Sequence, residues 1–516
     1  MTKTQKQNNQ KSKLFNTIWE IACSFWGKME ADDYKDYVLG LLFYRFLSEK
    51  VEKTVTKFLA YDEINNYEDA WEIQEYKEGL IQDLTTTLGY VIEPKYLFSY
   101  MVDMITIKKK EVEVEYLQKA INSLMESTMS NESQEAFDGI FDDFDLTSSK
   151  LGKSIKDRNK LISKAIVSIN KIDFDHDDAE IDVLGDAYEY LIGQFAAGAG
   201  KKSGSFYTPS QAGVLLSKLT TVGKTKVSNI LDSCGGSGSL LLHVADEVDV
   251  ANYHLQELTT NTFNLARMNF LLHNVGYKQM HMVNDDTLER PAFLDTPMDV
   301  IVANPPYSQK WSADEKFLED ERFSEYGVLP PKSYADFAFL LSMLHTLKQD
   351  GTMAILLPHG VLFRGGKEGE IRRKLIESKN YIDTVIGLPE NVFYGTSIPV
   401  AVLVLKKNKE KRDIFFIDAS KDYVKEGNKN YITDESINKI VNTYIARETI
   451  DKYSYLASFD EIKENDFNLN ISRYVDIFEE EEEIDIAEKK KEYAGLVKKS
   501  EEIDEKILGF FKELGI

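Results

Sequence analysis

The stretch Asn229-Ile-Leu-Asp-Ser-Cys-Gly-Gly-Ser-Gly-Ser239 is the part of the sequence that decides the fold. It begins in an apolar run that predicts a buried strand, and the residues after it have a helical pattern. A strand that enters a helix through Gly235, Gly236 and Gly238 lets the backbone approach a ligand closely. Glu257 ends the next predicted strand, at about the spacing where a carboxylate binds the hydroxyl pair of a ribose. The alternative is a plain strand–helix turn with a solvated glutamate.

Strand-like apolar runs alternate with helical patterns through the middle of the chain, as at residues 262–274 and 335–347. The predicted strands cover residues 227–232, 253–258, 280–284, 299–303, 352–357, 384–388, 400–405 and 414–417. Nearly continuous apolar strands in this alternation predict an α/β fold, with a mostly parallel sheet covered by helices on both faces. The strands after residue 384 have short connections, so part of that edge is predicted to be antiparallel.

The remaining segments differ from this pattern and give the predicted domain organisation. Before residue 172, apolar residues recur at three- and four-residue steps, which predicts helices. At the other end, five consecutive acids at 479–483 precede a helical stripe of apolar residues that runs from Ile486 to Leu514. We predict a disordered tail (1–13), an N-terminal helical domain (14–172), a catalytic domain (173–420), a C-terminal extension (421–478) and a C-terminal helix (479–516). The stripe of that helix either docks onto its own domain or contacts a partner subunit.

Composition limits the classes of function. Among 516 residues, 62 are Lys or Arg and 86 are Asp or Glu, which gives a net charge of −24. Such an acidic chain is not expected to hold nucleic acid tightly by itself, because phosphate neutralisation dominates that affinity. The only cysteines, Cys23 and Cys234, exclude a disulfide framework, and no zinc-ligand spacing occurs. The apolar stretch 37–47 is far shorter than the ~20 residues that span a bilayer. We therefore expect a cytoplasmic protein without a metal and without a membrane partner.

A second motif, Asp299-Val-Ile-Val-Ala-Asn-Pro-Pro-Tyr307, follows a predicted buried strand. Its last four residues, Asn304 to Tyr307, come after the carboxyl end of that strand, where ligands bind in open α/β sheets. Pro305 and Pro306 remove backbone donors and stiffen the loop, so that the Pro305 carbonyl and the Asn304 amide oxygen can point at one spot. Two such acceptors suit an exocyclic amino group, and Tyr307 offers a flat face to a planar base. The alternative is a proline-rich surface turn.

Together, the glycine loop and the Asn304-Pro-Pro-Tyr307 motif resemble the amino-group methyltransferases that use S-adenosylmethionine. Five segments are similar to the modification (methylase) subunit of type I restriction–modification systems, which makes N6-methyladenine. These segments are residues 184–191, 204–209, 284–288, 304–311 and 466–474. Residues 34–48 also resemble the helical domain of that family. The resemblance implies a Rossmann-like methyltransferase sheet with an N-terminal all-helical domain and a C-terminal helical tail.

The resemblance also implies roles for individual residues. The cofactor-binding residues would be Tyr207, Thr208, Asp232, Gly236, Ser237, Gly238, Glu257 and Asp286. Within this set, Glu257 would hold the ribose and Asp286 would meet the adenine amino group of the cofactor. Asn304, Pro305, Pro306 and Tyr307 would be the catalytic residues that hold the target adenine. Phe393 would stack on the other face of the base; a position in the core is the alternative.

The implied function is methyl transfer from S-adenosylmethionine to N6 of an adenine that is flipped out of double-stranded DNA. The implied partners are a specificity subunit, with two methylase copies on each, and a restriction (translocase) subunit. Other amino acceptors, a protein glutamine or an RNA guanine, are the alternative substrates. A basic group at residues 364–374 either contacts the DNA backbone or is a solvated helix face.

Overall fold

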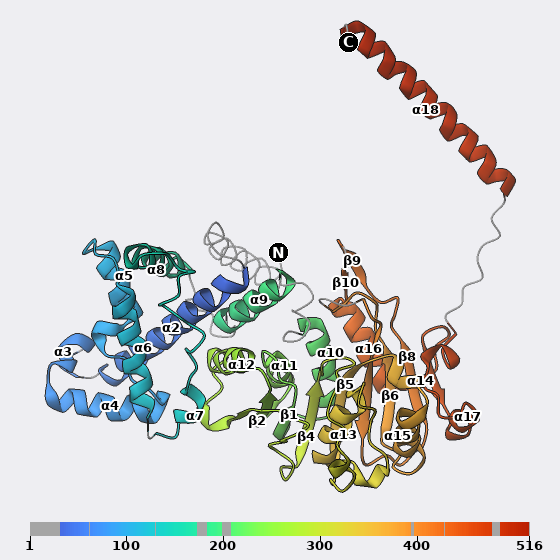
Figure 1. Ribbon diagram of the computed structural model, residues 1–516, viewed down its shortest axis with the longest axis horizontal. Coiled ribbons are helices and arrows are strands. Elements are labelled where there is room, and N and C mark those ends of the chain that lie inside the picture. Colours follow the sequence, from blue (N-terminus) through green and yellow to red (C-terminus); the bar gives the residue numbers. More distant parts are fainter. Residues whose placement is uncertain are drawn as a thin grey trace. The chain divides into compact units, whose positions relative to one another are not determined.

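A computed structural model of the chain describes residues 31–60, 62–64, 66–129, 131–172, 183–198, 208–393, 397–427, 429–476 and 486–514. The predicted tail 1–13 and the predicted cofactor-binding residue Tyr207 lie outside these residues. The chain separates into two compact units, residues 1–475 and 476–516 (Figure 1). Among the described residues, no helix has both the length and the apolar composition that crossing a bilayer requires.

The first described part of the chain is helical. Its helices are α2 (Ala31–Phe58), α3 (Tyr67–Trp71), α4 (Gln74–Leu88), α5 (Phe98–Thr106), α6 (Val114–Thr128), α7 (Gln134–Phe137) and α8 (Ile155–Asn170). Helix α2 buries large side chains such as Phe43 and Tyr44 in the common core. Its Arg45 is also buried and donates hydrogen bonds to the carbonyls of Ile169 and Ile172. This arginine therefore adds a side-chain donor at the C-terminal end of α8, where Ile169 also accepts from the N–H of Ile172 (3.1 Å).

The helical core continues onto the helices next to the sheet. Helix α9 (Val183–Gly198) and helix α12 (Thr260–Leu272) both contribute buried side chains to it. Arg267 of α12 is buried, and its guanidinium donates to the carbonyls of Glu135 (3.1 Å) and Asp138 (2.7 Å) beside α7. Burial, the largest effect on this group, lowers the pKa of Arg267 to about 10.

Among the described residues, the central sheet has nine strands in the order β11-β8-β6-β7-β5-β4-β1-β2-β3. The strands are β1 (Lys226–Asp232), β2 (Asp249–Glu257), β3 (Met280–Asn284), β4 (Met298–Ala303), β5 (Leu347–Pro358), β6 (Ile382–Gly387), β7 (Val400–Lys406), β8 (Ile414–Asp418) and β11 (Ser454–Ala457). From β3 to β5 all neighbours are parallel. The prediction of an α/β fold with a mostly parallel sheet is confirmed.

The antiparallel part of the sheet lies further inside it than the sequence suggested. Strand β7 is buried between β5 and β6 and is antiparallel to both. Strand β8 then pairs in parallel with the far side of β6. Strand β11 comes from the predicted C-terminal extension and pairs antiparallel with β8 as the last strand. All the long strands except β7 and β11 therefore point in one direction, and their carboxyl ends meet at one edge.

Helices cover both faces of this sheet (Figure 1). The covering helices are α10 (Ser210–Thr221), α11 (Ser239–Glu247), α12, α13 (Asp336–Thr346), α14 (Gly360–Phe363), α15 (Gly366–Glu377), α16 (Asp434–Ala446) and α17 (Phe459–Glu464). Helices α10, α11 and α16 share one core with alternate residues of the strands, such as Val300 and Val302 of β4. Because side chains alternate along a strand, Ile301 points to the opposite face.

Helix α18 (Ile486–Leu514) makes up the described part of the second unit. Its apolar stripe is exposed, with Tyr493 at 70%, Leu496 at 60% and Phe510 at 63% of their accessible surface. Lys and Glu residues occupy the positions between these side chains. The helix is therefore amphipathic, with the spacing of a helix that packs against other helices.

Candidate active site

Parallel pairing brings three polar residues to the carboxyl edge of the sheet. Strand β1 ends at Asp232, its neighbour β2 ends at Glu257, and β4 on its other side leads into Asn304. In open α/β sheets this edge is where ligands bind. The predicted cofactor-binding and catalytic residues therefore lie on adjacent strand ends, although they are far apart in the sequence.

The glycine loop between β1 and α11 needs its glycines for two reasons. Gly236 (φ 53°) and Gly238 (φ 79°) have left-handed backbone conformations, which side chains with a Cβ disfavour. A Cβ on Gly238 would lie 2.4 Å from the ring of Phe270 in α12. Ser237, between them, is buried, and its hydroxyl contacts that of Ser239 (2.9 Å) while its carbonyl accepts from Asn269. The loop thus brings its backbone to the strand end, and the Ser237 side chain bonds within the protein.

Two carboxylates lie against this loop. Glu257 accepts hydrogen bonds from the backbone N–H of Gly236 (3.0 Å) and of Thr259 (2.9 Å), one on each oxygen. Asp232 accepts from the N–H of Cys234 (2.9 Å) through Oδ1, while its buried Oδ2 has no partner among the described residues. Burial is the main cause that raises the pKa of Asp232 to about 7, and the nearby Glu257 adds to it. A buried carboxylate oxygen without a partner is costly, so Asp232 is a strong candidate for contact with a bound cation or donor.

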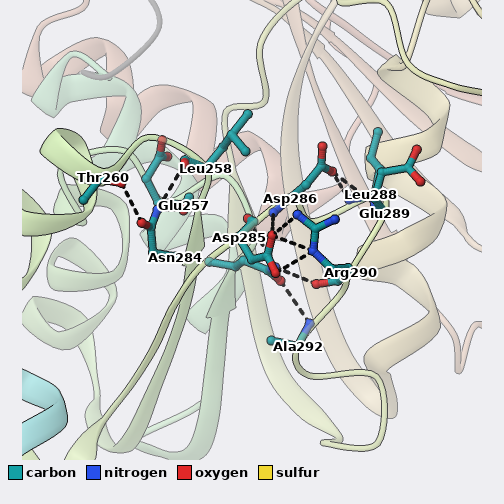
Figure 2. A network of polar contacts seen from close by, with 11 residues as sticks. Glu257, Leu258, Thr260, Asn284, Asp285, Asp286, Leu288, Glu289, Arg290 and Ala292 are labelled. Atoms are coloured by element: carbon teal, nitrogen blue, oxygen red, sulfur yellow. Dashed lines mark hydrogen bonds and ion pairs between the residues drawn. The ribbon is translucent and has the colours of Figure 1, made fainter.

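The loop after β3 closes the next side of the site, and Figure 2 shows its polar contacts. Asn284 donates to the carbonyls of Glu257 (2.8 Å) and Leu258 (3.0 Å), which ties this loop to the end of β2. The Oδ1 atom of Asp286 accepts from the N–H groups of Leu288 and Glu289, so the carboxylate also shapes its own turn. The loop is therefore rigidly placed beside Glu257.

Around Asn304 the side chains form a connected group. The Asn304 amide donates from Nδ2 to the hydroxyl of Thr208 (2.9 Å), and its Oδ1 accepts from the hydroxyl of Tyr307 (2.6 Å). The rings of Tyr307 and Phe393 meet edge to face, with centroids 6.2 Å apart. Phe393 is buried in the core of the sheet, and Pro305 is buried as well. The structure therefore brings Thr208, Asn304, Tyr307 and Phe393 together.

A cavity of about 200 Å³ lies between these segments. Of the predicted site residues, Glu257, Asp286, Asn304 and Pro306 line it. Thr208, Asp232, Tyr307 and Gly236 do not line it directly, but they contact residues that do. The sequence did not identify several other lining residues, which are Leu258, Thr287, Leu288, Lys310, Trp311 and Phe339. Among these, Thr287, Leu288 and Trp311 lie in the segments 284–288 and 304–311 that carry the family resemblance, which is the signal that could have assigned them to the site.

A buried arginine, Arg322, fixes one wall of the cavity. Its guanidinium donates to the carbonyls of Thr287 (3.4 Å) and Leu288 (3.0 Å) and pairs with both oxygens of Asp320. The side chain is 1% exposed and lies over the ring of Phe323. This arginine therefore links the segment after Trp311 to the loop that carries Asp286.

The basic group predicted near α15 is largely occupied by internal contacts. Arg372 is buried and donates to the carbonyls of Val361 and Phe467. Arg364 pairs with Asp336, and Lys374 donates to the carbonyl of Tyr326 (2.7 Å). The hypothesis that this group forms a DNA-backbone surface is therefore not supported for these three residues.

Comparison with known proteins identifies the family. The "N-6 DNA Methylase" family matches residues 179–483, and the "HsdM N-terminal domain" family matches residues 14–169. The methylase subunit of the type I restriction enzyme MpnII from Mycoplasma pneumoniae is 35% identical, over 99% of this chain and 98% of that protein. The chain belongs to the N-6 DNA methylase family.

Solved structures agree with this assignment. The methyltransferase subunit of a type I restriction–modification system from Streptococcus thermophilus is 42% identical, and it covers 90% of this chain and 100% of its own (TM-score 0.83). A protein from a structure of a type I restriction–modification assembly shares the fold at 19% identity (TM-score 0.60). This N-6 DNA methylase is thus an adenine-specific DNA methyltransferase of the type I restriction–modification class.

Replacement of Arg322 tests the wall of the cavity. Arg322→Ala leaves Asp320 and two carbonyls without their partner, so we expect the free energy of unfolding to fall by about 3–5 kcal/mol. Arg373→Ala is the control, because its pair with Glu377 is exposed and such pairs contribute about 0.3–0.5 kcal/mol. Urea unfolding followed by circular dichroism measures both. Equal losses in the two variants would contradict the structural role of Arg322.

Proposed function

We propose that the cavity at the carboxyl edge is where S-adenosylmethionine and the target adenine of double-stranded DNA meet. The observation that carries this proposal is the position of Asn304, which lines the same cavity as Glu257 and Asp286. An acceptor for an amino group and a carboxylate suited to a ribose thus lie in one space. Transfer of a methyl group depends mainly on such positioning, because it is an in-line displacement.

The residues of the cavity fit the cofactor by their chemistry. Glu257 already accepts two backbone N–H groups, and each of its oxygens keeps a lone pair that can accept from a ribose hydroxyl. The Oδ2 atom of Asp232 needs a donor, which the methionine amino group would supply. Leu258 and Leu288 offer apolar contacts to an adenine ring. Bound there, S-adenosylmethionine would supply a methyl group on a positively charged sulfur, which is a good leaving group.

For the target adenine, we propose that Asn304 and Pro305 accept its amino hydrogens. The Asn304 Oδ1 is held by the Tyr307 hydroxyl and retains a second lone pair for this role. Acceptors aimed at the amino group stabilise the positive charge that develops on nitrogen as the new bond forms, as donors do in an oxyanion hole. No strong general base is required of any residue.

Base flipping costs a few kcal/mol, and stacking on Tyr307 would recover about 1–3 kcal/mol of it. Phe393 lies at 85° to the Tyr307 ring, so one ring has to turn if the base is to stack on both. We propose that the base stacks first on Tyr307, whose side chain is part of the Asn304 group, and that Phe393 completes the pocket.

The partners follow from charge and from helix α18. A chain with a net charge of −24 that uses much of its basic group internally is suited to a separate subunit that reads the DNA sequence. We propose that α18 is the contact to this specificity subunit, with two methylase copies on each, and that a restriction subunit joins the larger complex. The exposed apolar stripe of α18 supports this proposal.

Replacement of Asn304 tests the proposed chemistry. We expect Asn304→Ala to lower the rate of adenine methylation at saturating substrates by about 10²–10³-fold, because a catalytic acceptor is lost. Tyr307→Phe keeps the stacking face and removes only the hydrogen bond to Asn304, so its loss is expected to be smaller. Incorporation of labelled methyl into N6-methyladenine, with the specificity subunit present, measures both rates. A normal rate in Asn304→Ala would refute the proposal.

The raised pKa of Asp232 predicts a pH dependence of cofactor binding. Below pH 7 this carboxyl group becomes protonated and no longer attracts the positively charged ligand. We therefore expect the affinity for S-adenosylmethionine to rise by up to about tenfold between pH 6 and pH 8. Calorimetric titration at several pH values measures this rise. In Asp232→Asn, whose amide does not titrate, the affinity for S-adenosylmethionine should be lower and this rise with pH should be absent. An affinity of the unmodified chain that does not change with pH would contradict the role assigned to Asp232.

The proposed role of α18 predicts a loss of assembly without a loss of cofactor binding. Leu496→Glu together with Ile503→Glu adds two negative charges to the apolar stripe, and we expect at least a tenfold weaker complex with the specificity subunit. The control is Lys498→Glu, which makes the same change in net charge on the opposite side of the helix. Size-exclusion chromatography of the mixed subunits measures assembly. Equal weakening by both variants would indicate a charge effect rather than a specific contact.

A further inference from the structure

A small hairpin stands at the same edge as the active site. Its strands, β9 (Val424–Glu426) and β10 (Lys429–Tyr431), pair only with each other among the described strands. They follow the carboxyl end of β8, which runs in the same direction as β6. The topology therefore places the hairpin at the carboxyl edge of the sheet, which is the edge that DNA has to approach in the proposed function.

Hydrogen bonds connect the hairpin to two segments of the active site. The ammonium group of Lys429 donates to the carbonyl of Phe393 (2.6 Å), and the Asn430 amide donates to the carbonyl of Glu390 (2.7 Å). On the other side, the Tyr431 hydroxyl accepts from the amide of Gln211, three residues after Thr208. The hairpin thus bridges the loop that carries Phe393 and the start of α10.

The hairpin presents side chains that suit nucleic acid. Tyr423 (41% exposed), Val424 (53%) and Tyr431 (39%) are among the exposed large side chains of the chain, and Lys425 is exposed beside them. The nearby Asp422 is neutralised by Lys439 at 2.8 Å. A cation and aromatic rings on a two-stranded ribbon are the features that contact a phosphate backbone and enter a groove.

The register of the hairpin shows on which of its faces Lys425 lies. Lys425 is directly opposite Asn430 in the hairpin, and paired residues project to the same face. Asn430 ties this shared face to the carbonyl of Glu390, and Lys429 ties the other face to the carbonyl of Phe393. The exposed Lys425 therefore lies on the rim beside the loop of residues 390–393. In a chain as acidic as this one, a cation at that place opposes the repulsion between protein and DNA.

We infer that the β9–β10 hairpin is a DNA-binding element of the active-site rim, in which Lys425 contacts a backbone phosphate next to the flipped adenine. The inference rests on the proposed function, because it needs DNA at this edge. It goes beyond that function by assigning a contact to the methylase chain itself, apart from those of the specificity subunit.

The test uses the full complex of this chain with its specificity subunit and a duplex that contains the target site. The variants are Lys425→Ala and Lys425→Arg. The control is Lys411→Ala, since Lys411 is also an exposed lysine, in the β7–β8 connection at the opposite edge of the sheet. The KM for DNA is measured between about 50 and 200 mM salt, together with kcat, cofactor affinity and the size of the complex.

We expect Lys425→Ala to raise the KM for DNA several-fold at low salt and to reduce the slope of log KM against log salt by about 0.9, the loss of one phosphate contact. Lys425→Arg should retain the slope, Lys411→Ala should match the unmodified complex, and kcat should stay constant. An unchanged slope in Lys425→Ala overturns the inference. Loss of the complex itself in that variant also overturns it, because the hairpin would then contact the specificity subunit. If the unmodified complex does not methylate adenine, the proposed function fails instead.

Discussion

The parallel hydrogen bonding of β1 with β2 and β4 is the constraint on which the active site depends. It fixes Asp232, Glu257 and Asn304 on three neighbouring strand ends, although more than 70 residues of chain separate the first from the last. Each loop that leaves these ends then needs only local contacts. The glycine turn reaches Glu257 through the N–H of Gly236, and Asn284 reaches the same strand end from β3. The order of the strands therefore determines which residues meet at the site, and the loops adjust their positions.

The free-energy cost of forming the site comes mainly from its buried polar groups. Asp232 keeps an oxygen without a partner among the described residues, and Glu257 has a pKa raised mainly by burial. An apolar pair at these positions would favour folding, so stability does not account for the two carboxylates. The proposed binding of a positively charged cofactor would account for them. Departures from the rules of good packing are expected where a protein has a function to perform.

Sequence reasoning identified what depends on local pattern. Nearly continuous apolar runs predicted strands β1 to β8 of the sheet but not β11, and the two motifs marked the ends of β1 and β4. The place of β7 between β5 and β6 was not predictable, because an apolar run such as Val400–Lys406 does not say which neighbours it pairs with. Arg322 was missed for a related reason: its partners at Thr287 and Leu288 are some 35 residues away in the chain and are backbone carbonyls, which leave no mark on the sequence.

The β9–β10 hairpin and the side chains around Asn304 were also only partly predictable from the sequence. Polar residues such as Lys425 and Asn430 carry no strand pattern, so nothing in the sequence set them apart from a loop. The motif indicated that Asn304 offers an acceptor, whereas the structure adds that Tyr307 and Thr208 hold both ends of its amide. Besides the stacking face proposed for it, the tyrosine thus has a hydroxyl that orients Asn304, and only the stacking face follows from its residue type.

The distribution of charge explains why the cofactor and the DNA are expected to bind to different surfaces of this methyltransferase. Four carboxylates and one lysine, Lys310, line the cavity. Asp285 is paired with Arg290 and Glu289 with Lys316, so Glu257 and Asp286 are the carboxylates that suit a cationic cofactor and repel a phosphate backbone. One surface cannot attract both a cationic cofactor and a phosphate backbone. Cations near the site can therefore attract DNA only from its rim, which the duplex would pass while the flipped base enters the cavity. This separation accounts for an acidic chain that acts on DNA. In the function proposed here, the negative interior of the sheet edge would hold the cofactor, and a few rim contacts together with a partner subunit would hold the DNA.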